Sequence, residues 1–167
     1  MSYPRVMLGG VPIELHAGPP AQSYETIGGS STVRLHEGAA VKLSHWRRTR
    51  ITLSGTGWMS PGLDGLDYDN ALELRCTKQQ AITSADNVIT LTGTPRPDVA
   101  PWALALVGDQ WVSTPCVVVA GVATLTPVVG ATLYQICWMP VFQVFAEPPP
   151  ESVEGGNFSW SIVAEEV

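Results

Sequence analysis

The chain has 167 residues, of which 45% are hydrophobic and only 14% charged. That length suits one domain with a substantial core, so neither a disulfide nor a metal is needed to support it. The formal net charge of −6 argues against general nucleic-acid binding. All nine Lys and Arg residues lie in the first 96 positions, whereas residues 97–167 carry seven acids and no base. This asymmetry suggests two electrostatically distinct ends, which head-to-tail self-association would use well. The alternative is a surface of low charge whose distribution has no functional meaning.

Apolar and polar residues alternate in short segments along the whole chain, which is the period of β-strands. The segments between residues 31 and 55 predict a meander whose charged face carries Arg34, Lys42 and Arg50. A loop rich in turn residues follows at 55–70. Further strands are predicted at 71–77, 87–92, 102–107, 116–120, 122–125, 132–138, 141–146 and 157–163.

About ten or more short strands at this spacing predict an all-β fold, an antiparallel β-sandwich or barrel. The simplest interpretation is a single β domain over residues 1–167. The proline-rich segment 94–101 favours a second interpretation, in which a β subdomain is inserted at about 94–137 and residues 138–167 return to the first sheet. Residues 147–156 are expected to form a flexible connector. Such a connector would let the last strand, residues 157–167, dock on another subunit by strand addition.

No catalytic motif is present. Ser54 and Ser60 lack the flanking glycines of a nucleophile elbow. The acidic loop at 64–70 is not followed by the glutamate that a calcium loop requires. The three cysteines, at positions 76, 116 and 137, fit no zinc or redox spacing and are interpreted as small buried hydrophobic residues. We therefore expect no enzymatic activity, no cofactor and no metal.

Residues 110–146 contain no charged side chain. Prolines and glycines interrupt this run every six to ten residues, whereas a membrane-spanning helix needs about 20 consecutive apolar residues. The run therefore predicts buried strands joined by turns, and no membrane partner is expected.

The most concentrated charge is basic, since residues 34–50 contain five bases and one acid. These bases could contact phosphates, face the acidic part of a neighbouring subunit, or lie in solvent at a hairpin tip. The acidic net charge favours the subunit contact, for which arginine is well suited. Aromatic residues of the last strand extend the candidate set. The predicted interface residues are Arg34, Lys42, Arg47, Arg48, Arg50, Phe158 and Trp160.

Three stretches resemble small tail-tip and baseplate components of tailed bacteriophages, especially distal tail proteins. The first is VMLGGVPIEL at residues 6–15, a strand pair around a glycine turn. The second covers residues 46–69, where WRRTRITLSGTGW precedes PGLDGLDYD. The third is the ending FSWSIVAEEV at residues 158–167.

The resemblance implies a β-sandwich protein of the virion tail that is assembled in the host cytoplasm. It implies a symmetric ring of identical subunits that joins the tail tube to the tip and contacts other tail or baseplate proteins. Many distal tail proteins are longer than this chain, so tube, tail-terminator and capsid-decoration roles stay open. A carbohydrate- or receptor-binding β-sandwich is the alternative, because six tryptophans could stack on sugar rings.

Overall fold

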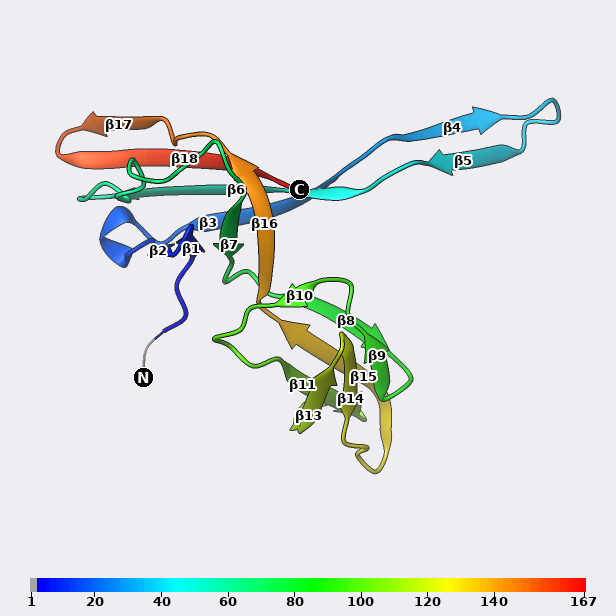
Figure 1. Cartoon of the computed structure of the whole chain (residues 1–167). Coiled ribbons are helices and arrows are strands. Elements are labelled where there is room, and N and C mark those ends of the chain that lie inside the picture. The colour runs from blue at the N-terminus through cyan, green and yellow to red at the C-terminus, as the bar shows by residue number, and fades with distance from the viewer. Residues whose placement is uncertain (1–2) are drawn as a thin grey trace. The chain divides into compact units, whose positions relative to one another are not determined.

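The computed structural model describes residues 3–167, and these residues form several antiparallel sheets (Figure 1). Strands account for 56% of the chain and helix for 2%. The predicted all-β class is therefore confirmed, and the antiparallel sheets are consistent with the predicted β-sandwich. Among residues 3–167 no helix has the length and apolar composition to cross a membrane.

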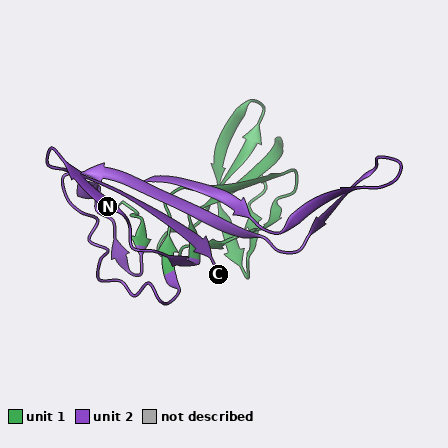
Figure 2. Ribbon diagram, turned by 90° about the horizontal axis from the view of Figure 1, so that it is seen from above, with its two compact units in different colours: residues 1–7, 73–142 green, residues 8–72, 143–167 purple. Residues whose placement is uncertain are grey.

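The chain divides into two compact units (Figure 2). Unit 1 comprises residues 73–142 together with the segment that ends at Met7, and unit 2 comprises residues 8–72 and 143–167. Unit 1 is thus inserted in the sequence between the two parts of unit 2. Its limits lie outside the predicted 94–137, because strands on both sides of that range pair within it.

Unit 1 is a sandwich of two small sheets, in the orders β12-β11-β15-β8 and β13-β14-β9. Its buried cluster includes Ala105 and Ile136 from the first sheet, and Ile89 and Leu125 from the second. The two sheets therefore pack face to face through their apolar sides. The strands are β8 (Gln80–Ser84), β9 (Val88–Thr90), β11 (Trp102–Val107), β12 (Gln110–Thr114), β13 (Cys116–Val119), β14 (Val122–Leu125) and β15 (Ala131–Trp138).

The uncharged run at 110–146 supplies most of these strands, and tight turns such as Gly108-Asp109 connect them. Cys76 and Cys137 are buried and Cys116 is half-buried, as the sequence predicts for small hydrophobic residues. Burial raises the pKa of the Cys116 and Cys137 thiols. A raised pKa keeps both side chains in the neutral form that suits an apolar environment.

The proline-rich segment holds the one charged side chain that is fully buried among the described residues, that of Arg96. It follows β10 (Thr94–Pro95), which pairs with the beginning of β16 (Pro140–Ala146). Its guanidinium donates to both carboxylate oxygens of Asp98, at 2.8 and 2.6 Å, and to the backbone oxygens of Arg5 and Cys76, at 2.9 and 3.1 Å. The hydrogen bond from Arg96 lowers the pKa of Asp98. Arg96 thus joins three parts of unit 1, in a segment that the sequence suggests is a linker.

We predict that Arg96→Met destabilises the protein by about 3 kcal/mol, because the buried carbonyl of Cys76, the partly buried carbonyl of Arg5 and the Asp98 carboxylate lose their donor. Chemical denaturation followed by tryptophan fluorescence measures this change. The matched control is Arg75→Met, because Arg75 forms partly exposed ion pairs with Glu73 and Asp98 that are worth about 1 kcal/mol or less. Equal losses for the two variants would contradict the structural role of Arg96.

Unit 2 is built on a long antiparallel sheet with β18 (Asn157–Glu166) at its centre. β6 (Arg48–Gly57) pairs with β18 over eight residue positions and with β3 (Ala21–Ile27) on its other side. β17 (Glu151–Glu154) and the end of β16 pair with β18 on its remaining side. The shorter elements β2 (Val11–Pro12) and η1 (Leu15–Ala17) belong to the first part of unit 2. β1 (Met7–Leu8) and β7 (Leu72–Arg75) span the sequence boundaries between the two units.

One face of this sheet is buried, with Ile51 and Leu53 from β6 and Ile162 and Ala164 from β18. Trp160 belongs to the same buried face, and its indole N–H donates to the backbone oxygen of Ala17 at 2.7 Å. The predicted subunit contact of Trp160 is therefore corrected: the ring is enclosed by its own unit. Gly55 makes room for it, because a Cβ there would lie 2.6 Å from the Trp160 ring.

Two expectations about the C-terminal part also change. The segment 147–156 is not flexible throughout, because Gly155 and Gly156 adopt positive φ angles and close a hairpin between β17 and β18. The last strand is not left free for strand addition to another subunit, because it is the central strand of its own sheet. Deletion of residues 157–167 would remove that strand and with it the fold of unit 2.

Candidate protein–protein interface

A β-hairpin arm, residues 28–47, extends from the sheet of unit 2 (Figures 1 and 2). It consists of β4 (Ser30–Arg34) and β5 (Ala40–Ser44), which pair with each other and with no other strand. Every residue of both strands is exposed. At about 3.4 Å per residue, the paired part alone is about 17 Å long.

The arm begins where the pairing of β3 with β6 becomes irregular. The last regular pair is Ile27 with Arg48, and pairing resumes at Ser30 with Ser44. Between these pairs, two residues on one side face three on the other. An extra residue of this kind bends and twists a ribbon as a β-bulge does. The arm is therefore a continuation of the sheet in a changed direction.

Gly28 and Trp46 form the base of the arm. A Cβ at position 28 would lie 2.2 Å from the backbone oxygen of Trp46, which is far inside contact distance. His45 donates its backbone N–H to the oxygen of Gly29 at 2.8 Å and closes the irregular segment. The two strands can approach this closely because residue 28 has no side chain.

The arm has one apolar and one polar face. Residues paired across antiparallel strands point to the same side, and Val33 pairs with Val41 while Leu43 pairs with Ser31. Leu35 follows on the same side. These four apolar side chains are between 39% and 55% exposed. The opposite face carries Thr32 with Lys42, Arg34 with Ala40, and Ser30 with Ser44.

The polar face carries cationic side chains from the hairpin turn to the base of the arm. Arg34 donates to the backbone oxygen of Gly38 at 3.0 Å in the hairpin turn. Lys42 and Arg47 line a hollow of about 340 Å³ beside Trp46, and over residues 3–167 neither forms an ion pair. This hollow offers two positive charges to an acidic group.

The other predicted interface residues lie in the sheet instead. Arg48 donates to a C-terminal oxygen of Val167 at 2.7 Å, and Arg50 donates twice to Glu165, at 3.0 and 2.8 Å. These contacts raise the pKa of Arg50 further. Phe158 is half-buried in β18. The structure therefore places Arg34, Lys42 and Arg47 on the arm, with only Lys42 and Arg47 lining the same hollow, and assigns Arg48 and Arg50 to contacts within unit 2.

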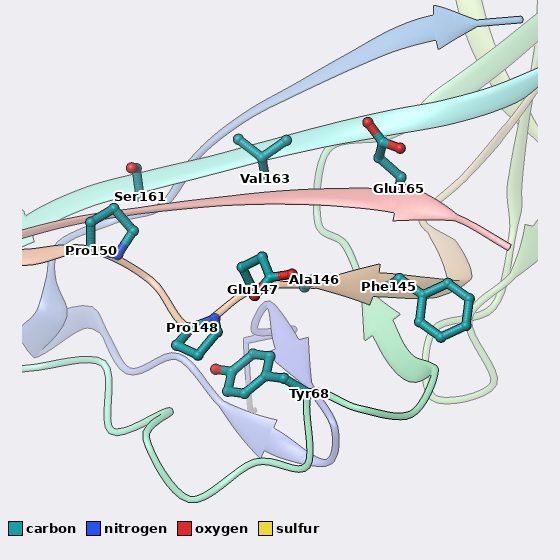
Figure 3. Close-up of a pocket in the computed structure, with 9 residues that line it drawn as sticks. All are labelled: Tyr68, Phe145, Ala146, Glu147, Pro148, Pro150, Ser161, Val163 and Glu165. Carbon is teal, nitrogen blue, oxygen red and sulfur yellow. The ribbon is translucent and has the colours of Figure 1, made fainter.

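A trough lies on the exposed face of the same sheet (Figure 3). Its volume is about 630 Å³. β18 contributes Val163 and Glu165, β16 contributes Phe145, and the loop before β7 contributes Tyr68. Phe145 and Val163 are each 51% exposed. The full lining is Tyr68, Phe145, Ala146, Glu147, Pro148, Pro150, Ser161, Val163 and Glu165.

The trough is firmly built and partly acidic. The Tyr68 hydroxyl donates to the backbone oxygen of Leu63 at 2.9 Å, and burial, with Asp64 and Glu151 nearby, raises the pKa of Tyr68. Glu147 and Glu165 supply carboxylates. The sequence does not reveal this site, because Tyr68 is far in sequence from the other lining residues at 145–165, which themselves meet through the pairing of β16 with β18.

Over residues 3–167 no three His, Cys, Asp or Glu side chains are grouped closely enough to hold a metal ion. His16 packs against Trp58, with their ring centroids 5.1 Å apart. No protein-family model matches the chain, and the search of curated proteins found no match either.

We predict that Gly28→Ala loosens the arm, because the added Cβ cannot fit beside the Trp46 backbone. Limited trypsin digestion should then cleave after Lys42 or Arg47 several-fold faster than in the unaltered protein. Gly65→Ala is the control, since a Cβ at position 65 meets nothing within 4 Å. Unchanged cleavage in Gly28→Ala would show that the arm does not depend on this close approach.

Proposed function

We propose that the chain is a non-enzymatic structural component of a bacteriophage virion, a tail or baseplate ring protein that links the tail tube to the tip. The arm supports the assembly part of this proposal, because its apolar face is uncovered within the chain. The phage part is supported by the resemblance of residues 6–15, 46–69 and 158–167 to distal tail proteins.

An exposed two-stranded arm calls for a partner on physical grounds. An isolated hairpin is at best marginally stable in water. Four aliphatic side chains on one face add an energetic reason for burial, since covering one Val or Leu side chain is worth about 1.5–3 kcal/mol. An assembly protein can use such an arm to hold a neighbour.

The distribution of charge supports assembly of identical subunits. Residues 28–47 carry Arg34, Lys42 and Arg47 against the single acid Glu37. The charged side chains of residues 97–167 are all acidic. Repeated contacts between a basic part of one copy and an acidic part of the next would produce a closed ring when the rotation between copies closes.

A carbohydrate- or receptor-binding module is the second candidate. It is favoured by Trp58, which is 63% exposed and packs on His16. An exposed indole of this kind can stack on a sugar ring. Glycan-array binding that is lost in Trp58→Ala, in a protein that stays monomeric, would support this function over assembly.

We predict that the purified protein forms rings or discrete multimers, and that Val33→Ser with Val41→Ser weakens their formation at least tenfold. Each replacement removes an aliphatic side chain from the apolar face of the arm, and about 1.4 kcal/mol corresponds to a factor of ten in affinity. Light scattering over a concentration series gives the mass, and negative-stain microscopy gives the symmetry.

Val129→Ser is the matched control, because Val129 is 97% exposed and lies in unit 1, outside the arm. It should assemble as the unaltered protein does. A monomer at all concentrations for the unaltered chain, or full assembly of the double variant, would contradict the proposal.

A further inference from the structure

We propose that the apolar face of the arm docks in the trough of a second copy of this chain. This inference rests on the proposed assembly function and names the surface that it uses. It joins two features of unit 2 that have no role within one molecule. The arm is the projecting part of the contact, and the trough is the receiving part.

One chain cannot make this contact with itself. The arm leaves the sheet at the pair Ile27 with Arg48 and points away from β17 and from the connector that follows β16 (Figures 1 and 2). The trough lies along that connector and along residues 161–165 of β18 (Figure 3). Because the arm continues the sheet, it would have to fold back sharply to reach its own trough.

The apolar parts of the two surfaces correspond. The arm presents Val33, Val41 and Leu43 on one face. The trough presents the rings of Tyr68 and Phe145 and the side chain of Val163. A hollow of about 630 Å³ lies in the range of natural binding pockets. Insertion of the aliphatic face would remove apolar surface from water on both partners.

The charges correspond as well. Glu147 gives the trough a negative charge, whereas the Glu165 carboxylate is already paired with Arg50. Arg34 and Lys42 give the arm a positive charge. A ribbon of two strands is narrow, so its long cationic side chains stay within the Debye length of about 8–10 Å of carboxylates at the rim.

A second copy is the partner that best fits these features. Both halves of the contact occur on every chain, and the contact is heterologous, so each copy offers an arm to one neighbour and a trough to another. Repetition of such a contact generates a ring or a filament without any further protein. The number of contacts per subunit is then two, whatever the symmetry of the ring.

Disulfide trapping between two differently labelled variants tests the contact directly. Val41→Cys is introduced in one preparation and Val163→Cys in the other, and the two are mixed under mild oxidation. We expect a disulfide-linked heterodimer on a non-reducing gel, which disappears on reduction. The control pairs Val41→Cys with Val153→Cys, since Val153 is 60% exposed on β17 but does not line the trough. That pair should cross-link at least tenfold more slowly.

The outcomes separate this inference from the proposed function. Rings without the Val41–Val163 cross-link would overturn the docking in the trough and leave the assembly function standing, with the arm seated elsewhere. A protein that neither assembles nor cross-links would overturn both. Equal cross-linking of the control pair would show contact by random collision and would also overturn the docking.

Charge reversal provides a second, independent measurement. Lys42→Glu and Glu147→Lys should each weaken association several-fold at low salt. A chain that carries both changes should recover most of the loss, because each arm then meets a trough of opposite sign. Failure of the double variant to recover, with each single variant impaired and folded, would contradict the pairing of these two surfaces.

Discussion

The pairing of β6 with β18 is the interaction on which the rest of unit 2 depends. It joins residues 48–57 to residues 157–166 over eight positions, although the whole of unit 1 lies between them in the sequence. Long closures of this kind cost chain entropy, and the buried face with Leu53 and Ile162 offsets that cost. At one end of this pair, the contacts of Arg48 with Val167 and of Arg50 with Glu165 hold the strands together. The arm begins at that same end.

Two surfaces follow from this one sheet. The apolar residues that β6 and β18 place on one face of this sheet, including Trp160, are buried, so they are not available to a partner. Its other face carries Val163 and Glu165, which become one wall of the trough. Beyond Ile27, β4 and β5 pair only with each other. The arm therefore extends into solvent with Val33 and Val41 uncovered. The proposed assembly uses the parts of the sheet that the monomer leaves open.

Much of this fold can be predicted from the sequence, because alternation with period two is a local signal. It identifies the all-β class and the hairpin around Gly38, with Arg34 and Lys42 on one face. The predicted meander over residues 31–55 is wrong, because β5 pairs only with β4, and Arg50 lies in β6 between β3 and β18 instead. Pairing between distant strands is not local, so the position of β18 beside β6 is not visible in the sequence. β17 is also missed, because the three prolines before it favour an extended connector and its own residues are polar.

Single residues show the same limit. A tryptophan suits both a core and an interface, and only the approach of Ala17 and the space at Gly55 assign Trp160 to the core. Arg96 lies among prolines that indicate a linker. Its guanidinium nevertheless donates to the backbone oxygens of Arg5 and Cys76, which are far from it in the sequence. The trough cannot be predicted at all without the pairing of β16 with β18.

The central claim is that the arm is covered by another copy of the chain. Hydrogen–deuterium exchange, measured at a series of protein concentrations, tests it most directly. The account predicts that amides of residues 30–44 become protected as the concentration rises, together with those around Phe145 and Val163, while amides of unit 1 exchange at a constant rate. Arm amides that exchange equally fast at every concentration, including those at which multimers form, would contradict it.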